Sequence, residues 1–130
     1  MKSERKRLEA RLDKLVRDYV RERDKWICYT CGKPGDEAGH FNRRGRRSTR
    51  WDLRNVHCQC FNCNGPLKGN KPIYRAKLIK EYGSEVVTEL EQLGYETAHF
   101  TIDDLRVKVA NMKEKLDELI NKQLDRGGVW

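Results

Sequence analysis

The stretch Cys28-Tyr-Thr-Cys31 and its counterpart Cys60-Phe-Asn-Cys63 decide how this chain folds. Each is a Cys-x-x-Cys pair, and the two pairs together supply the four thiols of a tetrahedral zinc site. They are separated by 28 residues, so an ion bound by both would join two loops that lie far apart in the sequence. Because four cysteines leave no open coordination position, we expect this zinc to be structural and not catalytic. The fifth cysteine, Cys58, is interpreted as a small half-buried residue.

The composition is that of a small basic protein. Its 130 residues are 37% charged and 37% hydrophobic, which predicts one domain with a modest core that a structural metal would help to stabilise. The formal net charge of +8 is typical of proteins that bind polyanions such as nucleic acid. No apolar run is long enough to span a bilayer, and the charged N-terminus lacks the apolar core of a signal peptide. We therefore expect a cytoplasmic protein that makes no use of a membrane.

Periodicity and turn signals divide the chain into residues 1–24, 25–70 and 71–130. The first part is predicted to be one amphipathic helix, because from residue 4 onward apolar side chains recur at alternating steps of four and three. The second part breaks this pattern and contains both cysteine pairs, so it is interpreted as the zinc-braced module. Within it, short strands are expected at 37–42 and 51–57.

The third part is predicted to be helical. Pro72 suits the first turn of one helix, Gly83 and Gly94 mark helix ends, and Thr101-Ile-Asp-Asp104 resembles a capping box before a last amphipathic helix. The apolar stripes of the first and last helices have three possible partners: each other, the zinc module, or a second chain in a coiled-coil-like homodimer. Packing within the chain is the default, and dimerisation is left open.

One histidine and two asparagines inside or beside the cysteine frame suggest a hydrolytic centre. Hydrolysis of a phosphodiester needs a base that takes a proton from water, and the neutral imidazole of His40 suits that task near pH 7. It also needs a cation against the scissile phosphate. Asn64 offers an oxygen ligand beside a cysteine of the zinc frame, and Asn55 is expected to fix the imidazole through a hydrogen bond.

The order His40, Asn55, Asn64 within two Cys-x-x-Cys pairs resembles the zinc-framed HNH, or ββα-metal, endonucleases. A more specific resemblance covers about residues 19 to 95. The segments that carry it are Tyr19-Val-Arg21-Glu-Arg23-Asp24, Cys28-Tyr-Thr-Cys31-Gly32, Ala38-Gly39-His40-Phe41 with Arg44-Gly45, Asn55-Val-His57-Cys-Gln59-Cys60-Phe-Asn-Cys63-Asn64, Gly69-Asn70, Tyr74-Arg75, Leu78-Ile79 and Tyr82-Gly83. In these segments the chain resembles the NinG (Rap) recombination nucleases of lambdoid phages.

The resemblance implies a fold and an activity. The expected fold is α+β and mostly helical, with a zinc-braced ββα-metal (HNH) module flanked by long N- and C-terminal helices. The expected activity is that of a structure-specific endonuclease that cuts branched DNA, such as Holliday junctions and D-loops, during phage recombination and leaves 5′-phosphate ends. Coordinated cutting of two strands favours a homodimer, and the expected host is a bacterium that carries the phage or prophage.

The identity of the carboxylate that would bind the catalytic metal is open. Many HNH enzymes have an aspartate just before the catalytic histidine, where this chain has Gly39. Strand alternation would place Glu37 on the same side as Gly39, so Glu37 is the first choice and Asp36 or Asp52 the next. His57 is a further possible ligand, or a polar residue that braces the second cysteine pair. Oxygen ligands favour Mg²⁺ or Mn²⁺ as the catalytic ion.

A run of basic residues next to this centre is expected to bind DNA phosphates, since arginine forms forked hydrogen bonds to phosphate. The residues are Arg43, Arg44, Arg46, Arg47, Arg50, Arg54, Lys68 and Lys71. Phosphate contacts position a protein without reading sequence, and this agrees with recognition of DNA by shape. Trp26 and Trp51 are more often core residues than stacking platforms, although either is suited to stack on exposed bases.

Two alternatives to the enzyme remain. The first is a non-catalytic zinc module that binds branched or single-stranded DNA, for which the missing aspartate is the best argument. The second is an assembly adaptor, in which the long helices recruit a partner recombination protein.

Overall fold

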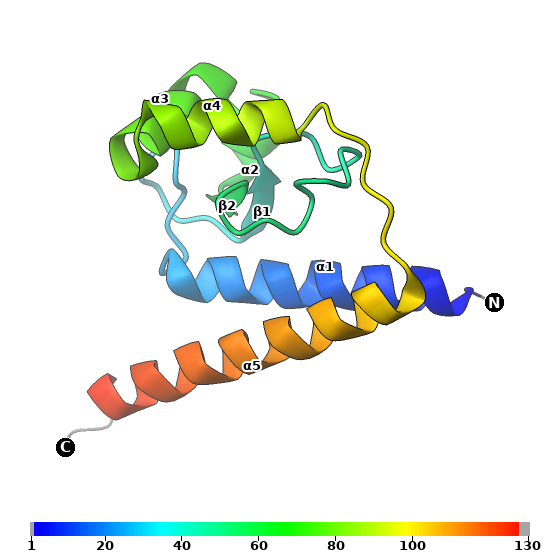
Figure 1. Cartoon of the computed structure of the whole chain (residues 1–130). Helices are drawn as coiled ribbons and strands as arrows, with labels where there is room; N and C mark the ends of the chain where they lie inside the picture. The colour runs from blue at the N-terminus through cyan, green and yellow to red at the C-terminus, as the bar shows by residue number, and fades with distance from the viewer. Residues whose placement is uncertain (1, 128–130) are drawn as a thin grey trace.

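The protein is described by a computed structural model that covers residues 2–127, in which a two-stranded antiparallel sheet lies between helices (Figure 1). This is an α+β, mostly helical fold, as expected from the sequence. The elements in chain order are α1 (Glu4–Arg23), β1 (Glu37–His40), β2 (Val56–Gln59), α2 (Phe61–Asn64), α3 (Lys71–Tyr82), α4 (Ser84–Leu93) and α5 (Ile102–Gly127).

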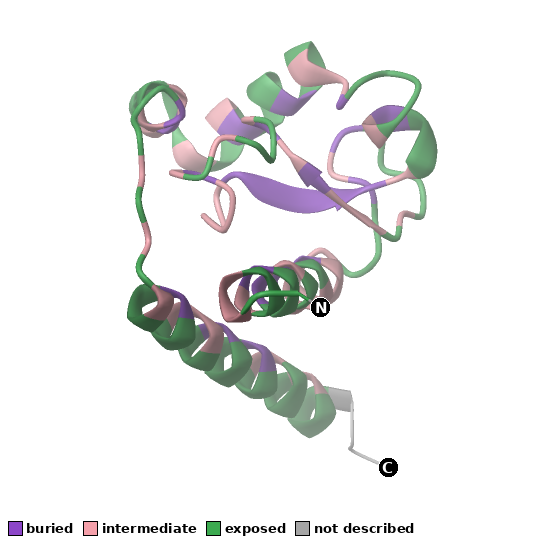
Figure 2. Ribbon diagram, turned by 90° about the vertical axis from the view of Figure 1, so that its right-hand side faces the viewer, coloured by how far each residue is buried: buried purple, intermediate pink, exposed green. Residues whose placement is uncertain are grey.

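The sheet is the middle layer of the molecule. Helices α3 and α4 lie on one side of it, α1 lies on the other, and α5 packs against α1 from outside (Figure 1). The strands pair with Glu37 opposite Gln59 and His40 opposite Val56. Since paired residues share a face and alternate along a strand, Val56 and His40 face α1, whereas Gly39 and His57 face the other side. All four residues of β2 are buried, which Figure 2 shows as a continuous purple ribbon.

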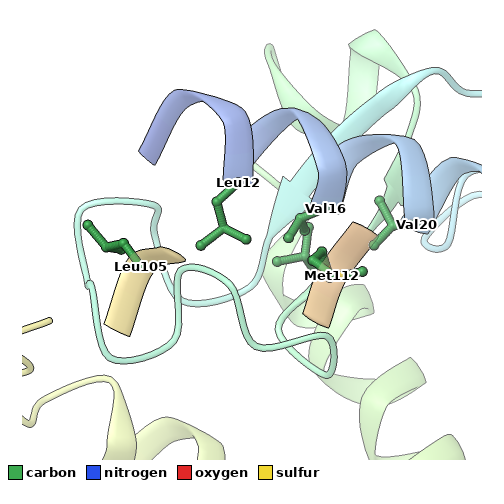
Figure 3. Packing of buried hydrophobic residues seen from close by; sticks show 6 residues of the cluster. Leu12, Val16, Val20, Leu105 and Met112 are labelled. Carbon is green, nitrogen blue, oxygen red and sulfur yellow. The ribbon is translucent and has the colours of Figure 1, made fainter. Parts of the chain in front are cut away.

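Helix α1 is the centre of the larger core. The Ser3 hydroxyl accepts a hydrogen bond from the Lys6 N–H (3.2 Å) and caps the helix. The buried stripe of Leu12, Val16 and Val20 then packs against α5 and the sheet (Figure 3). Burying each such side chain contributes roughly 1.5–3 kcal/mol. The predicted N-terminal helix is confirmed, and its stripe packs within the chain on both α5 and the module.

Helix α5 contributes the other half of this interface. The predicted capping box forms reciprocally, because Asp104 accepts from the Thr101 N–H (2.9 Å) and the Thr101 hydroxyl accepts from the Asp104 N–H (3.0 Å). Leu105 and Met112 are buried against α1, in line with the predicted apolar stripe (Figure 3).

The second strand lies further along the chain than the sequence suggested. The expected strand at 51–57 is observed at Val56–Gln59, and the first strand ends at His40 instead of at residue 42. The reason is that residues 41–55 form a loop of successive turns, within which Trp51 and Leu53 pack into the α1 core. These two side chains are apolar because they pack the loop against the α1 core, and not because they form part of a strand.

A second, aromatic core fills the other face of the sheet. Tyr74 of α3 is buried there and donates a hydrogen bond from its hydroxyl to the Gly39 carbonyl oxygen (2.8 Å). His57 stacks on Tyr29, with 3.9 Å between ring centroids, and its Nδ1 lies 3.1 Å from the Tyr74 hydroxyl. Burial, with a smaller contribution from Arg23, lowers the pKa of His57 to about 2, so its imidazole is neutral in the folded protein.

This buried imidazole predicts a pH dependence of stability. The ordinary histidine pKa is about 6.5, so below that pH the unfolded chain takes up a proton that the folded chain does not. Stability is therefore fully present above pH 6.5 and is lost as the pH falls. We expect His57 to account for a loss of about 1.4 kcal/mol in unfolding free energy between pH 7.5 and 5.5.

Urea denaturation of wild type and His57→Phe across that window measures the contribution. The other groups that face the imidazole are Tyr29, Tyr74, Tyr82, Glu81 and Arg23. These groups are present in both proteins, so the difference between the two profiles reports on His57, and the variant should have the flatter profile. Parallel profiles for the two proteins would show that His57 does not carry the effect.

Candidate functional site

The four cysteines of the two Cys-x-x-Cys pairs form one cluster. Their sulfur atoms all lie within 4.8 Å of one another, and the sulfurs of Cys31 and Cys60 are 3.7 Å apart. A tetrahedral zinc site with Zn–S bonds of about 2.3 Å places its sulfurs about 3.8 Å apart. Cys28, Cys31, Cys60 and Cys63 can therefore hold a single metal ion such as zinc, whereas Cys58 is buried in the sheet away from them.

The local structure of the cluster directs hydrogen-bond donors at its sulfur atoms. Gly32, at φ +77°, turns the chain after Cys31 and donates its N–H to the Cys28 carbonyl (2.9 Å). Cys60 caps α2 by accepting a hydrogen bond at its sulfur from the Cys63 N–H (3.4 Å). Burial raises the pKa of Cys28, but hydrogen bonds from the Thr30 hydroxyl and nearby N–H groups outweigh it and lower the pKa to about 6. Donors directed at sulfur fit a metal-binding role.

Loss of one ligand should therefore remove the metal and destabilise the fold. We expect wild type and Cys58→Ala to contain one zinc per chain by elemental analysis, and Cys60→Ser to contain substantially less and to melt at a lower temperature. Because Cys58 lies outside the cluster, its variant controls for the loss of a buried thiol. Full zinc content in Cys60→Ser would contradict the assignment of the ligands.

His40 lies at the end of β1 and lines a hollow of about 500 Å³. Its Nε2 lies 3.0 Å from the Arg50 carbonyl oxygen. Because a carbonyl only accepts, the proton is assigned to Nε2, and Nδ1 carries the lone pair. Burial lowers the pKa of His40 below its ordinary value, so the imidazole is neutral at pH 7 and can accept a proton.

Two oxygen-bearing side chains meet in the same hollow. The Asn64 amide, at the end of α2, donates a hydrogen bond from Nδ2 to Glu37 Oε1 (2.8 Å) at the start of β1. The contact places an amide oxygen and a carboxylate beside each other and next to Cys63. Amide and carboxylate oxygens are the ligands that hard divalent cations prefer.

Asn55 acts differently from the sequence-based prediction. Its side chain is fully buried and forms no hydrogen bond with the His40 ring. Instead its Oδ1 accepts from the Asn42 N–H (2.7 Å), and its Nδ2 donates to the carbonyls of Asn42 (3.1 Å) and Thr49 (3.0 Å). Asn55 thus closes the loop whose Arg50 carbonyl holds the imidazole, so it positions His40 through the backbone.

Steric crowding explains why position 39 is a glycine. A Cβ added there would lie 1.8 Å from Oε1 of Gln59, which is buried on the paired strand. Gln59 is held by hydrogen bonds from its Nε2 to Thr30 (3.2 Å) and to the Gly69 carbonyl (3.0 Å). An aspartate before His40 cannot be accommodated unless Gln59 moves.

The alternative metal ligands separate into two groups. Asp36 lines the His40 hollow together with Glu37. Asp52 does not, because its carboxylate is paired with Arg54 (2.8 Å) in the loop. His57 does not either, since it is buried on the opposite face of the sheet, between Tyr29 and Tyr74. The geometry therefore supports the bracing role for His57 and not the role of a ligand beside His40.

The arginine cluster is partly engaged within the chain. Arg50 binds Asp13 (2.6 Å), Arg47 pairs with Glu9, and Arg54 pairs with Asp52, so each of these three side chains already contacts a carboxylate. The remaining cations are Arg43, Arg44, Arg46, Lys68 and Lys71. Arg44 is 62% exposed while it contacts Asp13, and Lys71 donates from Nζ to the carbonyls of His40 and Phe41.

Asp13 is the residue that sequence reasoning missed. It lies on α1, 27 residues before His40, and accepts hydrogen bonds from Arg44, Arg50 and the Trp51 indole. Burial raises its pKa, but these donors outweigh that effect and lower it. Trp51 also packs against Phe100, so it is a core residue, whereas Trp26 is 43% exposed beneath the Arg21 guanidinium.

These features define a small α+β protein that has a four-cysteine cluster beside a hollow lined by a histidine. The sequence profile of the family described as "Bacteriophage Lambda NinG protein" matches residues 1–122. The chain is 34% identical over 113 residues to "Protein ninG" of Escherichia phage 933W, which covers 83% of this chain and 56% of that protein. It is 33% identical over 113 residues to "Protein ninG" of Escherichia phage lambda, which covers 83% of this chain and 55% of that protein. It is 32% identical over 109 residues to "Protein ninG" of Salmonella phage P22, which covers 80% of this chain and 53% of that protein. The chain therefore belongs to the NinG family of bacteriophage proteins.

The chain spans about half the length of the curated relatives that it matches. No solved structure is similar to it at a significant level. Within residues 2–127, the structure has no helix whose length and apolar character would let it cross a membrane.

Proposed function

We propose that this protein is a metal-dependent endonuclease of the HNH type that cuts branched DNA, such as Holliday junctions and D-loops, during phage recombination in the cytoplasm of the bacterial host. The observation that carries the proposal is the meeting of His40, Glu37 and Asn64 in one hollow beside the cysteine cluster. The order β1, β2, α2 agrees with a ββα-metal module, and the net charge of +8 agrees with a DNA substrate.

His40 is the general base in this proposal. Its neutral imidazole takes a proton from the attacking water at Nδ1, while the Arg50 carbonyl holds the Nε2 proton and fixes the ring. The proton that Nδ1 gains makes the ring cationic, and the Asp13 carboxylate lining the same hollow favours that charge. His40 therefore touches the reacting water, and Asn55 holds the loop that orients His40.

Glu37 and Asn64 would hold the catalytic cation, Mg²⁺ or Mn²⁺, which would supply positive charge against the scissile phosphate and the leaving oxygen. Glu37 provides the carboxylate that many HNH enzymes provide with an aspartate just before the catalytic histidine, where this chain has Gly39. Arg44, which is exposed at the rim and restrained by Asp13, binds a flanking phosphate and positions the strand. The products carry 5′-phosphate ends, and a homodimer with two such centres cuts two strands.

Replacing the base should abolish cutting and preserve binding. We expect His40→Ala to cleave synthetic four-way, flap or nicked-duplex DNA at least about 100-fold more slowly in Mg²⁺ or Mn²⁺ than wild type. Affinity measured in Ca²⁺ should change little, because imidazole is not the main phosphate contact. His99→Ala, at an exposed histidine between α4 and α5, is the matched control and should cleave normally. Undiminished cleavage by His40→Ala would exclude the assigned base.

The carboxylate ligand can be tested in the same assay. Glu37→Gln keeps the size of the side chain and a partner for the Asn64 amide, but it removes the charge that attracts a divalent cation. We expect its cleavage to require at least about tenfold more Mg²⁺. Asp52→Asn, outside the hollow, should retain the Mg²⁺ dependence of wild type. The reverse pattern would assign the metal to the loop.

A non-catalytic module that binds branched or single-stranded DNA is the second candidate, and Gly39 is the observation that favours it. If wild type binds branched DNA but never cleaves it with Mg²⁺ or Mn²⁺, this second function is correct. Recruitment of a partner recombination protein by α1 and α5 stays a further prediction, testable by deleting the exposed end of α5.

A further inference from the structure

We infer that a second groove, on the far side of Lys71 from His40, binds the unpaired strand of branched DNA; this inference extends the proposed nuclease function by naming where the strand leaves the cutting site. The groove has a volume of about 600 Å³ and lies between the loop after β1, the start of α3 and the end of α4. Its cationic and aromatic lining is Phe41, Arg43, Arg46, Lys71, Arg75 and Tyr95.

The groove neighbours the His40 hollow. A third hollow, of about 380 Å³, shares His40 and Asn64 with the first hollow, and Arg43 and Lys71 with the groove. In this inference, a strand whose phosphate lies at His40 passes Arg43 and reaches Tyr95.

The charge of the groove matches a polyanion. Four cations line it against one carboxylate, Glu91, which is paired with Arg75 (3.0 Å). Within the described part of the chain, Arg43 and Arg46 form no ion pair with an acidic side chain. The other arginines of the same loop are paired with Glu9, Asp13 or Asp52. Among the described residues, Arg43 and Arg46 have no such partner, so they contact the phosphates of the strand in this groove.

The aromatic lining favours an unpaired strand over a duplex. Tyr95 is 78% exposed at the turn after α4, and the Arg46 guanidinium lies 4.9 Å from the centre of its ring. An exposed aromatic ring beside arginine is the usual stacking platform for single-stranded nucleic acid, and it is tolerant of sequence. Bases inside a duplex already stack on their neighbours, so only an unpaired base gains from this ring.

The test uses the full chain in Ca²⁺, without cleavage, and DNA with 2-aminopurine in an unpaired flap. Fluorescence anisotropy and base quenching report on flap binding, and a blunt duplex of the same length is the reference. Tyr95→Ala should weaken flap binding by about 5- to 100-fold and abolish the quenching, while duplex binding stays within about twofold. Tyr95→Phe keeps the ring and should behave as wild type.

Two further variants separate stacking from charge and from folding. Arg46→Ala should also weaken flap binding, whereas Lys115→Ala, which removes one exposed cation from α5, should not. Equal melting temperatures of Tyr95→Ala and wild type confirm that the fold is intact. Unchanged flap binding by Tyr95→Ala, or an equal loss for flap and duplex, would overturn the inference.

The outcome is distinguishable from that of the proposed nuclease. If wild type never cleaves but Tyr95 governs flap binding, the groove is real and the catalytic proposal fails. If wild type cleaves while Tyr95→Ala binds the flap normally, the nuclease stands and the groove is not the path of the strand.

Discussion

The clustering of four cysteine thiols, which can hold one metal ion such as zinc, is the interaction on which the rest of this structure depends. Each strand of the sheet has only four residues, and a two-stranded sheet of that length is not stable in isolation. Cys60 directly follows β2, and Cys28 and Cys31 come from the loop that leads into β1, so the cluster fixes the end of the sheet at Glu37 and Gln59. The same cluster fixes α2, and with it Asn64, beside Glu37.

The other end of the sheet is held without metal. The Asn55 side chain joins the two arms of the long loop between the strands, and the Tyr74 hydroxyl binds the Gly39 carbonyl. Asp13 of α1 then holds Arg50, whose carbonyl orients His40. The position of His40 therefore depends on a buried amide, a buried hydroxyl and an ion pair. In this arrangement α1 helps to position the site as well as forming the core.

The features readable from sequence were those with a local signal. The cysteine pairs and the helical stripes repeat at short spacing, so the cysteine cluster and the helices were predictable. The second strand was misplaced because Trp51 and Leu53 are apolar for the sake of loop packing. Asp13 was missed because a contact between α1 and a loop 30 or more residues later leaves no periodic trace.

For the same reason, the sequence does not show which arginines of the cluster contact acidic residues far away in the chain. Six arginines in twelve residues read as one phosphate-binding surface, yet acidic residues bind Arg47, Arg50 and Arg54. Which of these arginines remain without an acidic partner is decided by the contacts that the fold supplies. Likewise, Gly39 read as a missing ligand, and only the fold shows that Gln59 occupies the space of a side chain there.

X-ray absorption at the zinc edge of the purified chain tests the central claim most directly, because it counts the atoms bound to the ion. The account predicts a first shell of four sulfurs at about 2.3 Å and no nitrogen or oxygen. A shell with fewer than four sulfurs, or with a histidine nitrogen among the ligands, would contradict it.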